Sequence, residues 1–504
     1  MSMRRLIELA VLLLTAGAAY AANPPQVRFD WSHPKTAVKT QPAMEVCVEP
    51  PMLRGRRTHD GLYRTLGDFN GEYSRLAFWF PYPKMAVAEL DAPTAHKTSW
   101  DFAYLDQIVA DFMQATQGRS VMVNFSTIPE WMFKTRARVP YADNVDQIDW
   151  NYEQGVELRD PSLREVRDYF VRLFNWYTQG GFTDELGQRH ESGHHYKFTV
   201  WEVLNEVDFE HHLSPELYTR IYDEVVEALR KLDPQLKFSG PALAHPMGQP
   251  QYVQYFLDPS HHKPGIPLDF VSYHFYAAPD ADESAASEEH TFFKMMDGFL
   301  ATVRSIELER QRLTPRTRTF INELGTMSTD NFSPNESIPE SYWALSSAAF
   351  AYAYLNLVKQ QIDLVGGAEL INYPTQVPGA SLTDWNTGEP NARYRGLKLL
   401  SDAIRPGDRL VDDDERDLLN VDDPSTVAPK YYAVQGFLGS DGGRKVVLVN
   451  KRSRPLRVQV AGAKGGSVLS VDLQSNGRLP TSRSLASDMI DLQGFAVAVV
   501  HLGR

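Results

Sequence analysis

Between about residue 43 and residue 404, short and almost continuous apolar runs alternate with longer segments whose apolar residues recur every three or four positions. Continuous apolar runs are typical of parallel strands covered on both faces, and the longer spacing is typical of helices with one buried face. The runs predict eight strands, at Ala43–Val48, Tyr73–Phe80, Ser120–Phe125, Lys197–Leu204, Leu236–Gly240, Leu268–Phe275, Arg318–Asn322 and Ala368–Tyr373.

The helical segments between these strands carry signals for where they begin. The segment 162–180 starts with Ser162 and Glu165, which have the spacing of a capping box. The segment 214–232 starts with Ser214 as a candidate N-cap. Eight strands that alternate with such helices predict an α/β protein built on a (β/α)8 barrel.

A doubly wound sheet is the competing α/β architecture. It would place a glycine-rich phosphate-binding turn directly after the first strand. The residues found there, Val46 to Pro50, contain no glycine. The barrel is therefore the preferred interpretation for residues 22–405, which form the predicted catalytic domain.

The pattern changes after Arg405. An acidic stretch between residues 412 and 423 reads as a solvated loop, and turn residues then separate short strands. We expect residues 406–504 to form an antiparallel β-sandwich, and Val27–Trp31 is a candidate further strand of it. The expected sandwich strands are Tyr431–Phe437, Lys445–Asn450, Leu456–Ala461, Val468–Leu473 and Phe495–Leu502.

Residues 1–21 have the organisation of a signal peptide. Arg4 and Arg5 precede the apolar run Leu6–Leu14, and Ala19 and Ala21 form a small-residue cleavage site. This predicts a periplasmic or secreted protein. No other stretch is long enough to cross a bilayer, and a single cysteine excludes an internal disulfide.

Composition and charge narrow the range of partners. The chain has 504 residues, of which 43% are hydrophobic and 23% charged, as in a globular protein. The formal net charge of −13 disfavours nucleic acid as a partner. We expect neither a nucleic-acid nor a membrane partner, and the oligomeric state stays open.

Two short segments carry the candidate chemistry. Trp201–Glu206 and Phe320–Gly325 each place a glutamate directly after a predicted strand, at Glu206 and Glu323. Barrel enzymes carry their reacting groups at the C-terminal ends of the strands. Retaining glycosidases need two carboxyl groups that face each other across a sugar, one as proton donor and one as nucleophile. The pair therefore predicts glycoside hydrolysis.

Neighbouring residues fit the same site. Asn205 directly precedes Glu206, and its amide can reach a hydroxyl group next to the reacting carbon. His274 and Tyr276 lie two residues apart on the predicted sixth strand, so that both side chains point to the same face. We expect both of them in the mouth of the barrel.

With these residues the chain resembles glycoside hydrolase family 39, a family of clan A retaining glycosidases that includes β-xylosidases and α-L-iduronidases. The resemblance rests on the Asn-Glu pair, the His-x-Tyr motif, the two glutamates after strands four and seven, and the trailing sandwich. It implies that Glu206 is the acid/base and Glu323 the nucleophile. It also implies that Asn205, His274 and Tyr276 contact the sugar or the nucleophile, and that Arg75 lies beneath the nucleophile.

The resemblance also implies a substrate. Where the iduronidase branch carries a lysine two residues after the strand-six histidine, this chain has Tyr276. We therefore expect a β-D-xylosidase acting on xylo-oligosaccharides or related glycosides, with α-L-arabinosidase side activity. Tyr276 and Tyr373 are the candidate wall beyond the fifth ring carbon, and Tyr373 stands where the family has a tryptophan. Other possibilities are an α-L-iduronidase-like enzyme, a β-glucosidase-type enzyme and a non-catalytic carbohydrate-binding barrel.

One motif points to a different chemistry. His190, Glu191 and His194 match the H-E-x-x-H signature of zinc proteases. That motif binds zinc only on a helix, and Gly193 lies inside it just before a predicted strand. We therefore expect no metal and no cofactor.

Overall fold

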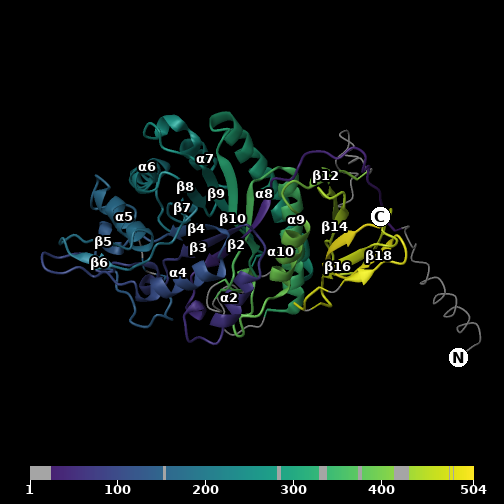
Figure 1. Ribbon diagram of the computed structural model, residues 1–504, viewed down its shortest axis with the longest axis horizontal. Coiled ribbons are helices and arrows are strands. Elements are labelled where there is room, and N and C mark those ends of the chain that lie inside the picture. The colour runs from purple at the N-terminus through teal and green to yellow at the C-terminus, as the bar shows by residue number, and fades with distance from the viewer. Residues whose placement is uncertain are drawn as a thin grey trace, which may run out of the picture.

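The computed structural model describes residues 24–503 apart from 151, 153–154, 281–284, 329–337, 373–376, 414–430, 476 and 481. A strand-and-helix barrel and a smaller part made of antiparallel sheets lie side by side along the long axis (Figure 1). The predicted signal peptide and most of the acidic stretch lie outside the described residues. No helix in the described part of the chain combines the length and apolar character of a membrane span.

Eight parallel strands close the barrel in the order β10-β11-β2-β3-β4-β7-β8-β9. The predicted α/β class and (β/α)8 barrel are confirmed. The strands are β2 (Gln41–Cys47), β3 (Tyr73–Phe78), β4 (Ser120–Phe125), β7 (Val200–Glu202), β8 (Lys237–Leu243), β9 (Phe270–Ala277), β10 (Arg318–Thr326) and β11 (Leu364–Gly367).

Helices cover the outside of the barrel (Figure 1). They are α2 (His59–Gly67), α3 (Pro83–Ala86), α4 (Ala103–Ala115), α5 (Arg164–Thr178), α6 (Pro215–Leu232), α7 (Pro250–Leu257), α8 (Ala285–Leu313), α9 (Glu340–Lys359) and α10 (Ala392–Ala403). Short 3₁₀ turns lie at Pro50–Met52, Glu130–Met132, Pro259–His261 and Pro378–Ala380.

The helix starts were predicted with mixed success. Ser214 caps α6 as expected. The start of α5 is different, because Asp160 and not Ser162 accepts hydrogen bonds from the backbone N–H groups of Arg164 and Glu165, at 2.9 and 3.1 Å. The Ser162 hydroxyl instead donates to Asp160, at 2.6 Å. A carboxylate is the stronger acceptor and takes the cap position.

The eighth strand was predicted in the wrong place. It spans Leu364–Gly367, before the predicted segment Ala368–Tyr373. Its two glycines resembled a turn, but one of them is needed for packing: a Cβ on Gly366 would lie 2.4 Å from the carbonyl oxygen of Asn322. Only glycine allows the two strands to approach this closely. Tyr373, which the prediction placed at the end of this strand, lies outside the described residues.

The sandwich consists of a six-stranded and a three-stranded sheet. Figure 1 shows it beside the barrel, next to α9 and α10. Strand β1 pairs with β15 in parallel, so the start of the Val27–Trp31 segment joins the sandwich. The strands are β1 (Gln26–Val27), β12 (Arg409–Val411), β13 (Tyr432–Leu438), β14 (Arg444–Asn450), β15 (Leu456–Val460), β16 (Ser467–Val471), β17 (Arg483–Ser484), β18 (Met489–Leu492) and β19 (Val497–His501).

The H-E-x-x-H motif is not helical. His190 and Glu191 lie on β6 (Arg189–Glu191), which pairs with β5 (Gly181–Thr183) in an antiparallel hairpin before β7. His190 Nε2 lies 2.9 Å from a carboxylate oxygen of Asp184. On a strand, the motif's residues do not share a face at the spacing that zinc binding needs.

Side chains inside the barrel form two layers of opposite character. The lower layer is an apolar cluster made of Ala43, Tyr73, Met122, Val200, Phe270, Phe320 and Leu364. Two residues further along, each strand points its next side chain to the same side. In six of these seven strands that residue is polar: Glu45, Arg75, Asn124, Glu202, Ser272 and Asn322. The apolar layer fills the lower interior of the barrel. A site at the C-terminal ends of the strands lies directly above the polar layer.

Glu202 holds the polar layer together. It is fully buried, and side chains from five other strands donate to its two oxygens. The donors are Arg75 Nε at 2.6 Å, Asn124 Nδ2 at 2.8 Å, Ser239 Oγ at 3.0 Å, Ser272 Oγ at 2.7 Å and Asn322 Nδ2 at 2.8 Å. Burial acts to raise the pKa of Glu202, but the charge of Arg75 and the hydrogen bonds outweigh it and lower the pKa.

Replacing Glu202 with glutamine should destabilise the fold strongly. The change leaves Arg75 short of a buried counter-charge, which typically lowers the free energy of unfolding by about 3–5 kcal/mol. Because the folded pKa is lowered, this contribution is complete above the unfolded value of about 4.5 and is lost as pH falls through the folded pKa. Denaturant unfolding at several pH values would measure it.

The matched control is Glu157→Gln. Glu157 also pairs with a cation, Lys134, but 67% and 54% of the two side chains are exposed. Exposed pairs contribute little. Equal destabilisation by both variants at neutral pH would contradict the role given to Glu202.

Candidate active site

Glu206 lies on the loop that follows β7, the fourth strand of the barrel. The backbone here is unusual, with φ of 61° at Leu204 and 39° at Glu206. Left-handed backbone at such residues is strained and persists only where the surroundings enforce it. Leu204 is fully buried, and the Glu206 N–H donates to the carbonyl of Ala242 on β8 at 2.9 Å. The loop therefore holds the Glu206 carboxyl in one place.

Glu323 lies within β10, the seventh strand, which continues to Thr326 and so past the predicted end at Asn322. The register against β9 shifts between Ile321 and Glu323, so that a bulge falls at Asn322. A bulge turns consecutive side chains to the same side of a strand. It lets Asn322 reach Glu202 while Glu323 reaches the layer above.

His274 connects the two glutamates. Its Nδ1 lies 2.9 Å from Glu206 Oε1 and 3.3 Å from Glu323 Oε2. One atom from each of the three side chains lies within 4.8 Å of the others. The structure therefore brings together, above the polar layer, the two carboxyls and the histidine that the sequence singled out.

The surroundings favour a proton on Glu206 and on His274. Burial raises the pKa of Glu206, and the charge of Glu323 adds to this, while hydrogen bonding to His274 opposes it. Burial lowers the pKa of His274, but the charges of Glu323 and Glu206 outweigh burial and raise it. The Glu206–His274 pair therefore keeps its protons to higher pH than the separate groups would.

Arg75 on β3 lies beneath Glu323, where the resemblance expects an arginine. Its Nη1 donates to Glu323 Oε1 at 2.7 Å and to Glu45 at 3.2 Å, and its Nη2 donates to Asn205. The side chain is fully buried. Burial acts to lower its pKa, but the surrounding carboxylates, Glu202 first, raise it further above its usual range.

Of the three remaining predicted residues, the structure describes Asn205 and Tyr276 but not Tyr373. Asn205 is buried beside Glu206, and its amide nitrogen donates to Glu210 at 2.8 Å. Tyr276 donates its hydroxyl to Glu323 Oε2 at 2.9 Å and also lies 3.0 Å from Glu369. Tyr373 was predicted as part of the same wall, and its placement lies outside the described residues.

Sequence reasoning missed several polar residues around this site, of which four matter most for the argument. Glu45, Glu202 and Asn322 each lie two positions after a buried apolar residue, a signal that period-two reading of the strands contains. Glu369 was missed for another reason: it directly follows Gly367 and Ala368, and the misplaced eighth strand put it inside a strand.

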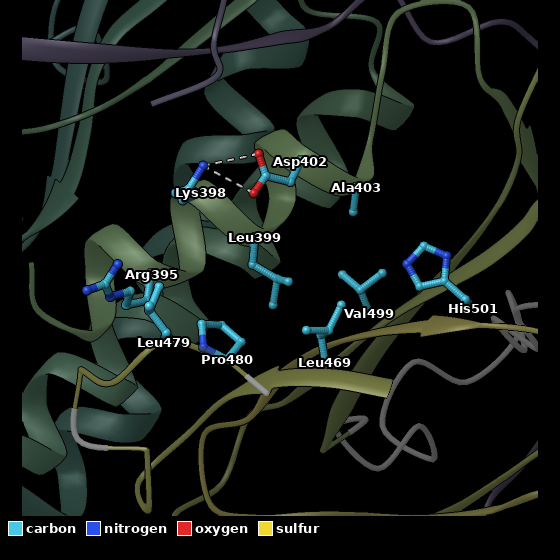
Figure 2. Close-up of a pocket in the computed structure, with 10 residues that line it drawn as sticks. All are labelled: Arg395, Lys398, Leu399, Asp402, Ala403, Leu469, Leu479, Pro480, Val499 and His501. Atoms are coloured by element: carbon cyan, nitrogen blue, oxygen red, sulfur yellow. Dashed lines mark hydrogen bonds and ion pairs between the residues drawn. The ribbon is translucent and has the colours of Figure 1, made fainter. Parts of the chain in front are cut away.

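A separate cavity of about 230 Å³ lies between α10 and the sandwich, away from these residues (Figure 2). Its floor is apolar, formed by Leu399, Leu469 and Val499. The one carboxylate on its wall, Asp402, is paired with Lys398 at 3.3 Å. A single paired carboxylate cannot carry out two-carboxylate chemistry, so this cavity is not the candidate active site.

Comparison with known sequences finds a family model that covers this site and two relatives that match part of the chain. The sequence model of Glycosyl hydrolases family 39 matches residues 186–344, which include Glu206, His274 and Glu323. A β-xylosidase of Caldicellulosiruptor saccharolyticus is 31% identical over 104 residues, which are 21% of this chain and 20% of the relative. A β-xylosidase of Geobacillus stearothermophilus is 23% identical over 190 residues, 38% of this chain and 33% of the relative. The chain thus spans only about a fifth to a third of the relatives it matches.

Comparison with solved structures extends over nearly the whole chain and concerns the fold. A family 51 α-L-arabinofuranosidase from Bifidobacterium longum has a TM-score of 0.61 at 13% identity, covering 96% of this chain and 100% of its own. A GH39 β-xylosidase from Caulobacter crescentus has a TM-score of 0.56 at 15% identity, covering 95% and 99%. The chain therefore shares the fold of these proteins, and in sequence it resembles Glycosyl hydrolases family 39 and its β-xylosidases.

Proposed function

We propose that this chain is a retaining exo-glycosidase with Glu206 as acid/base and Glu323 as nucleophile. One observation carries the proposal: His274 bridges the two carboxyls, and one oxygen of each lies within 4.8 Å of the other. Retaining enzymes hold their carboxyls about 5–5.5 Å apart, whereas inverting enzymes leave about 6.5–9.5 Å for a water molecule. The short separation favours the retaining mechanism.

The surroundings of the two carboxyls support different roles. Arg75 and Tyr276 donate hydrogen bonds to the two oxygens of Glu323, which orients the group as a nucleophile. Glu206 contacts no arginine or lysine in the described part of the chain, and its pKa is raised. A general acid needs such a raised pKa so that it still carries its proton near neutral pH.

The reaction then has two steps. In the first, a Glu323 oxygen forms a bond to the anomeric carbon, the glycosidic C–O bond breaks, and the Glu206 proton goes to the leaving oxygen. In the second, water attacks the same carbon, its proton returns to Glu206, and Glu323 leaves as a carboxylate. His274 and Asn205 flank Glu206 and are placed to orient it and the sugar.

A β-D-xyloside is the proposed substrate, with an α-L-arabinoside as the second choice. Both sequence relatives of this chain reported above are named β-xylosidases. The chain has Tyr276, which cannot pair with a carboxylate as a lysine would, in the position where the iduronidase branch has a lysine. A pentose has no exocyclic carbon, and bulk at this wall rejects hexoses by steric clash.

A metal-dependent reaction is the alternative at these same residues. Glu206, His274 and Glu323 offer ligand atoms close enough to hold a divalent ion. The Arg75 guanidinium lies 2.7 Å from Glu323, however, and repels a cation there. Both Glu323 oxygens already accept hydrogen bonds, so we propose a metal-free reaction.

Removing either glutamate should affect the rate in a different way. Glu323→Ala should lower turnover by about three orders of magnitude or more on every substrate, because no covalent intermediate forms. Glu206→Ala should slow bond cleavage about 10²–10⁴-fold for poor leaving groups and far less for activated aryl groups, which need little protonation. Steady-state and burst kinetics on both substrate types would measure this, with Glu157→Ala as a surface control. Equal losses on both types for Glu206→Ala would overturn its assignment as the acid/base.

A panel of aryl glycosides should rank the substrates. We expect β-D-xyloside to be cleaved fastest, α-L-arabinoside more slowly, and β-D-glucoside and α-L-iduronide poorly, because bulk beyond the fifth ring carbon excludes larger sugars by steric clash. The measurement is kcat/KM for each. A preference for glucoside or iduronide would overturn the substrate and leave the two-carboxylate mechanism standing.

Chelators should leave the activity unchanged. Dialysis against a strong chelator removes any bound divalent ion, and a metal-dependent enzyme would lose its rate and regain it on adding metal. His190→Ala should have no effect either, since His190 lies on the β5–β6 hairpin at the other end of β7. Loss of activity on chelation, together with one equivalent of bound metal, would revive the alternative.

A further inference from the structure

Glu369 is a carboxyl at the site that the proposed mechanism does not use. It follows β11 directly after Ala368, and only 6% of the residue is exposed. Its backbone is fixed by the loop opposite, because its N–H donates to Ala380 at 2.8 Å and its carbonyl accepts from Leu382 at 2.7 Å. The side chain is thus built into the wall of the site.

Glu369 and the proposed nucleophile Glu323 both contact the hydroxyl group of Tyr276. The Tyr276 oxygen lies 2.9 Å from Glu323 Oε2 and 3.0 Å from Glu369 Oε1, and its hydroxyl carries a single proton. Two ionised carboxylates would compete for that proton, and one contact would be left as oxygen facing oxygen. A second proton, on one of the two carboxyls, satisfies both contacts.

The environment selects Glu369 as the carboxyl that carries it. Arg75 donates directly to Glu323, but no cation donates to Glu369 among the described residues: the nearby Arg393 gives its bonds to the carbonyls of Ala368 and Gly379, at 2.6 and 3.0 Å. The second oxygen of Glu369 is buried with no partner in the described part of the chain. An ionised carboxylate in such a position would carry a large desolvation free energy that no hydrogen bond offsets.

The titration of Glu369 agrees with this geometry. Burial raises its pKa to about 8, the charge of Glu323 adds to the rise, and Tyr276 and Arg393 oppose it. Among the described residues, the ionisable groups that act on it are Glu45, Cys47 and Glu49 from β2 and its end, Tyr276 from β9, Glu323 from β10, Glu206 from the loop after β7, and Arg393 from α10.

We propose that Glu369 is a positioning residue, which as a neutral acid donates its proton to the Tyr276 oxygen and thereby keeps the Tyr276 hydroxyl directed at Glu323. The proposal rests on the proposed function, since Glu323 must be the nucleophile for this bond to affect the rate. When base removes the Glu369 proton, the Tyr276 proton is shared between two carboxylates. The nucleophile then loses an oriented hydrogen bond and gains a negative neighbour. Glu369 itself takes no part in forming or breaking a bond of the substrate.

Kinetics without the general acid would isolate this effect. In Glu206→Ala, an activated aryl glycoside reports formation of the glycosyl-enzyme with no contribution from the ionisation of Glu206. We expect the burst rate to fall as pH rises through about 8, because Glu369 is neutral below its raised pKa and ionised above it.

Three further variants in that background give the contrast. Glu369→Gln keeps a neutral donor to Tyr276, so the rate near pH 6 should persist and the alkaline fall should disappear. Glu369→Ala removes the donor and should lower the rate about tenfold near pH 6, as expected for one lost hydrogen bond. Glu49→Gln is the matched control, since Glu49 is also buried with a raised pKa but bonds to Tyr82, and its profile should keep the alkaline fall. An alkaline fall that survives in Glu369→Gln would overturn the proposal.

A measurement without substrate separates this proposal from the glycosidase assignment. We would compare infrared difference spectra between about pH 6 and about pH 9.5. The signal of one ionising carboxylic acid should be present in the wild type and absent from Glu369→Gln. Identical spectra would overturn the proton on Glu369 whatever the substrate is. If the spectra differ as expected but no aryl glycoside is cleaved by the wild type, the proposed function fails and the rate effect of Glu369 fails with it.

Discussion

The guanidinium of Arg75 is the charge around which the barrel interior is arranged. It is fully buried and donates to Glu45, Glu202 and Glu323, which come from three other strands. A buried cation is tolerated only when it is paired and hydrogen-bonded, and here the same bonds that satisfy it fix the positions of its partners. Stability of the polar layer and orientation of the proposed nucleophile therefore depend on a single side chain.

One cation cannot neutralise every carboxyl that the barrel gathers. Glu202 receives the closest contact from Arg75, and its pKa is lowered. The pKa values of Glu45, Glu206 and Glu369 are all raised, mainly by burial and then by their neighbours' charges. The carboxyls that Arg75 does not neutralise are neutralised by binding a proton. The site thus sorts its carboxyls into charged and protonated ones, which is the distinction that acid and nucleophile require.

The sequence pattern predicted the parts of this site that depend on local order. Apolar runs located seven of the eight barrel strands, and Glu206 and Glu323 followed because reacting groups collect at strand ends. His274 and Tyr276 followed from the two-residue period of a strand. The eighth strand failed because the close approach of Gly366 to Asn322 is a tertiary requirement, and a glycine pair read locally resembles a turn.

The roles that could not be predicted are those of residues whose partners are far away in the chain. Glu202 lies four positions before Glu206 and carries no local mark that separates it from a catalytic carboxyl. Its five donors come from five other strands, and only barrel closure brings them together. The bulge at Asn322, which lets adjacent residues serve two layers, likewise depends on pairing with β9. Local pattern therefore finds strand ends, but closure decides which carboxyl is structural.

The end of the eighth strand differs from what the family resemblance implies. The family resemblance implies a tryptophan platform at this strand, and Tyr373 was the predicted counterpart, but the strand ends at Gly367 and Ala368 and Glu369 directly follow it. A tryptophan supports a sugar through its apolar ring face, whereas a carboxyl acts only through directed hydrogen bonds. The exchange leaves Arg75, Glu206 and Glu323 untouched, because they belong to other strands. Glu369 nevertheless reaches Glu323 through Tyr276, so the end of β11 belongs to the surroundings of the proposed nucleophile.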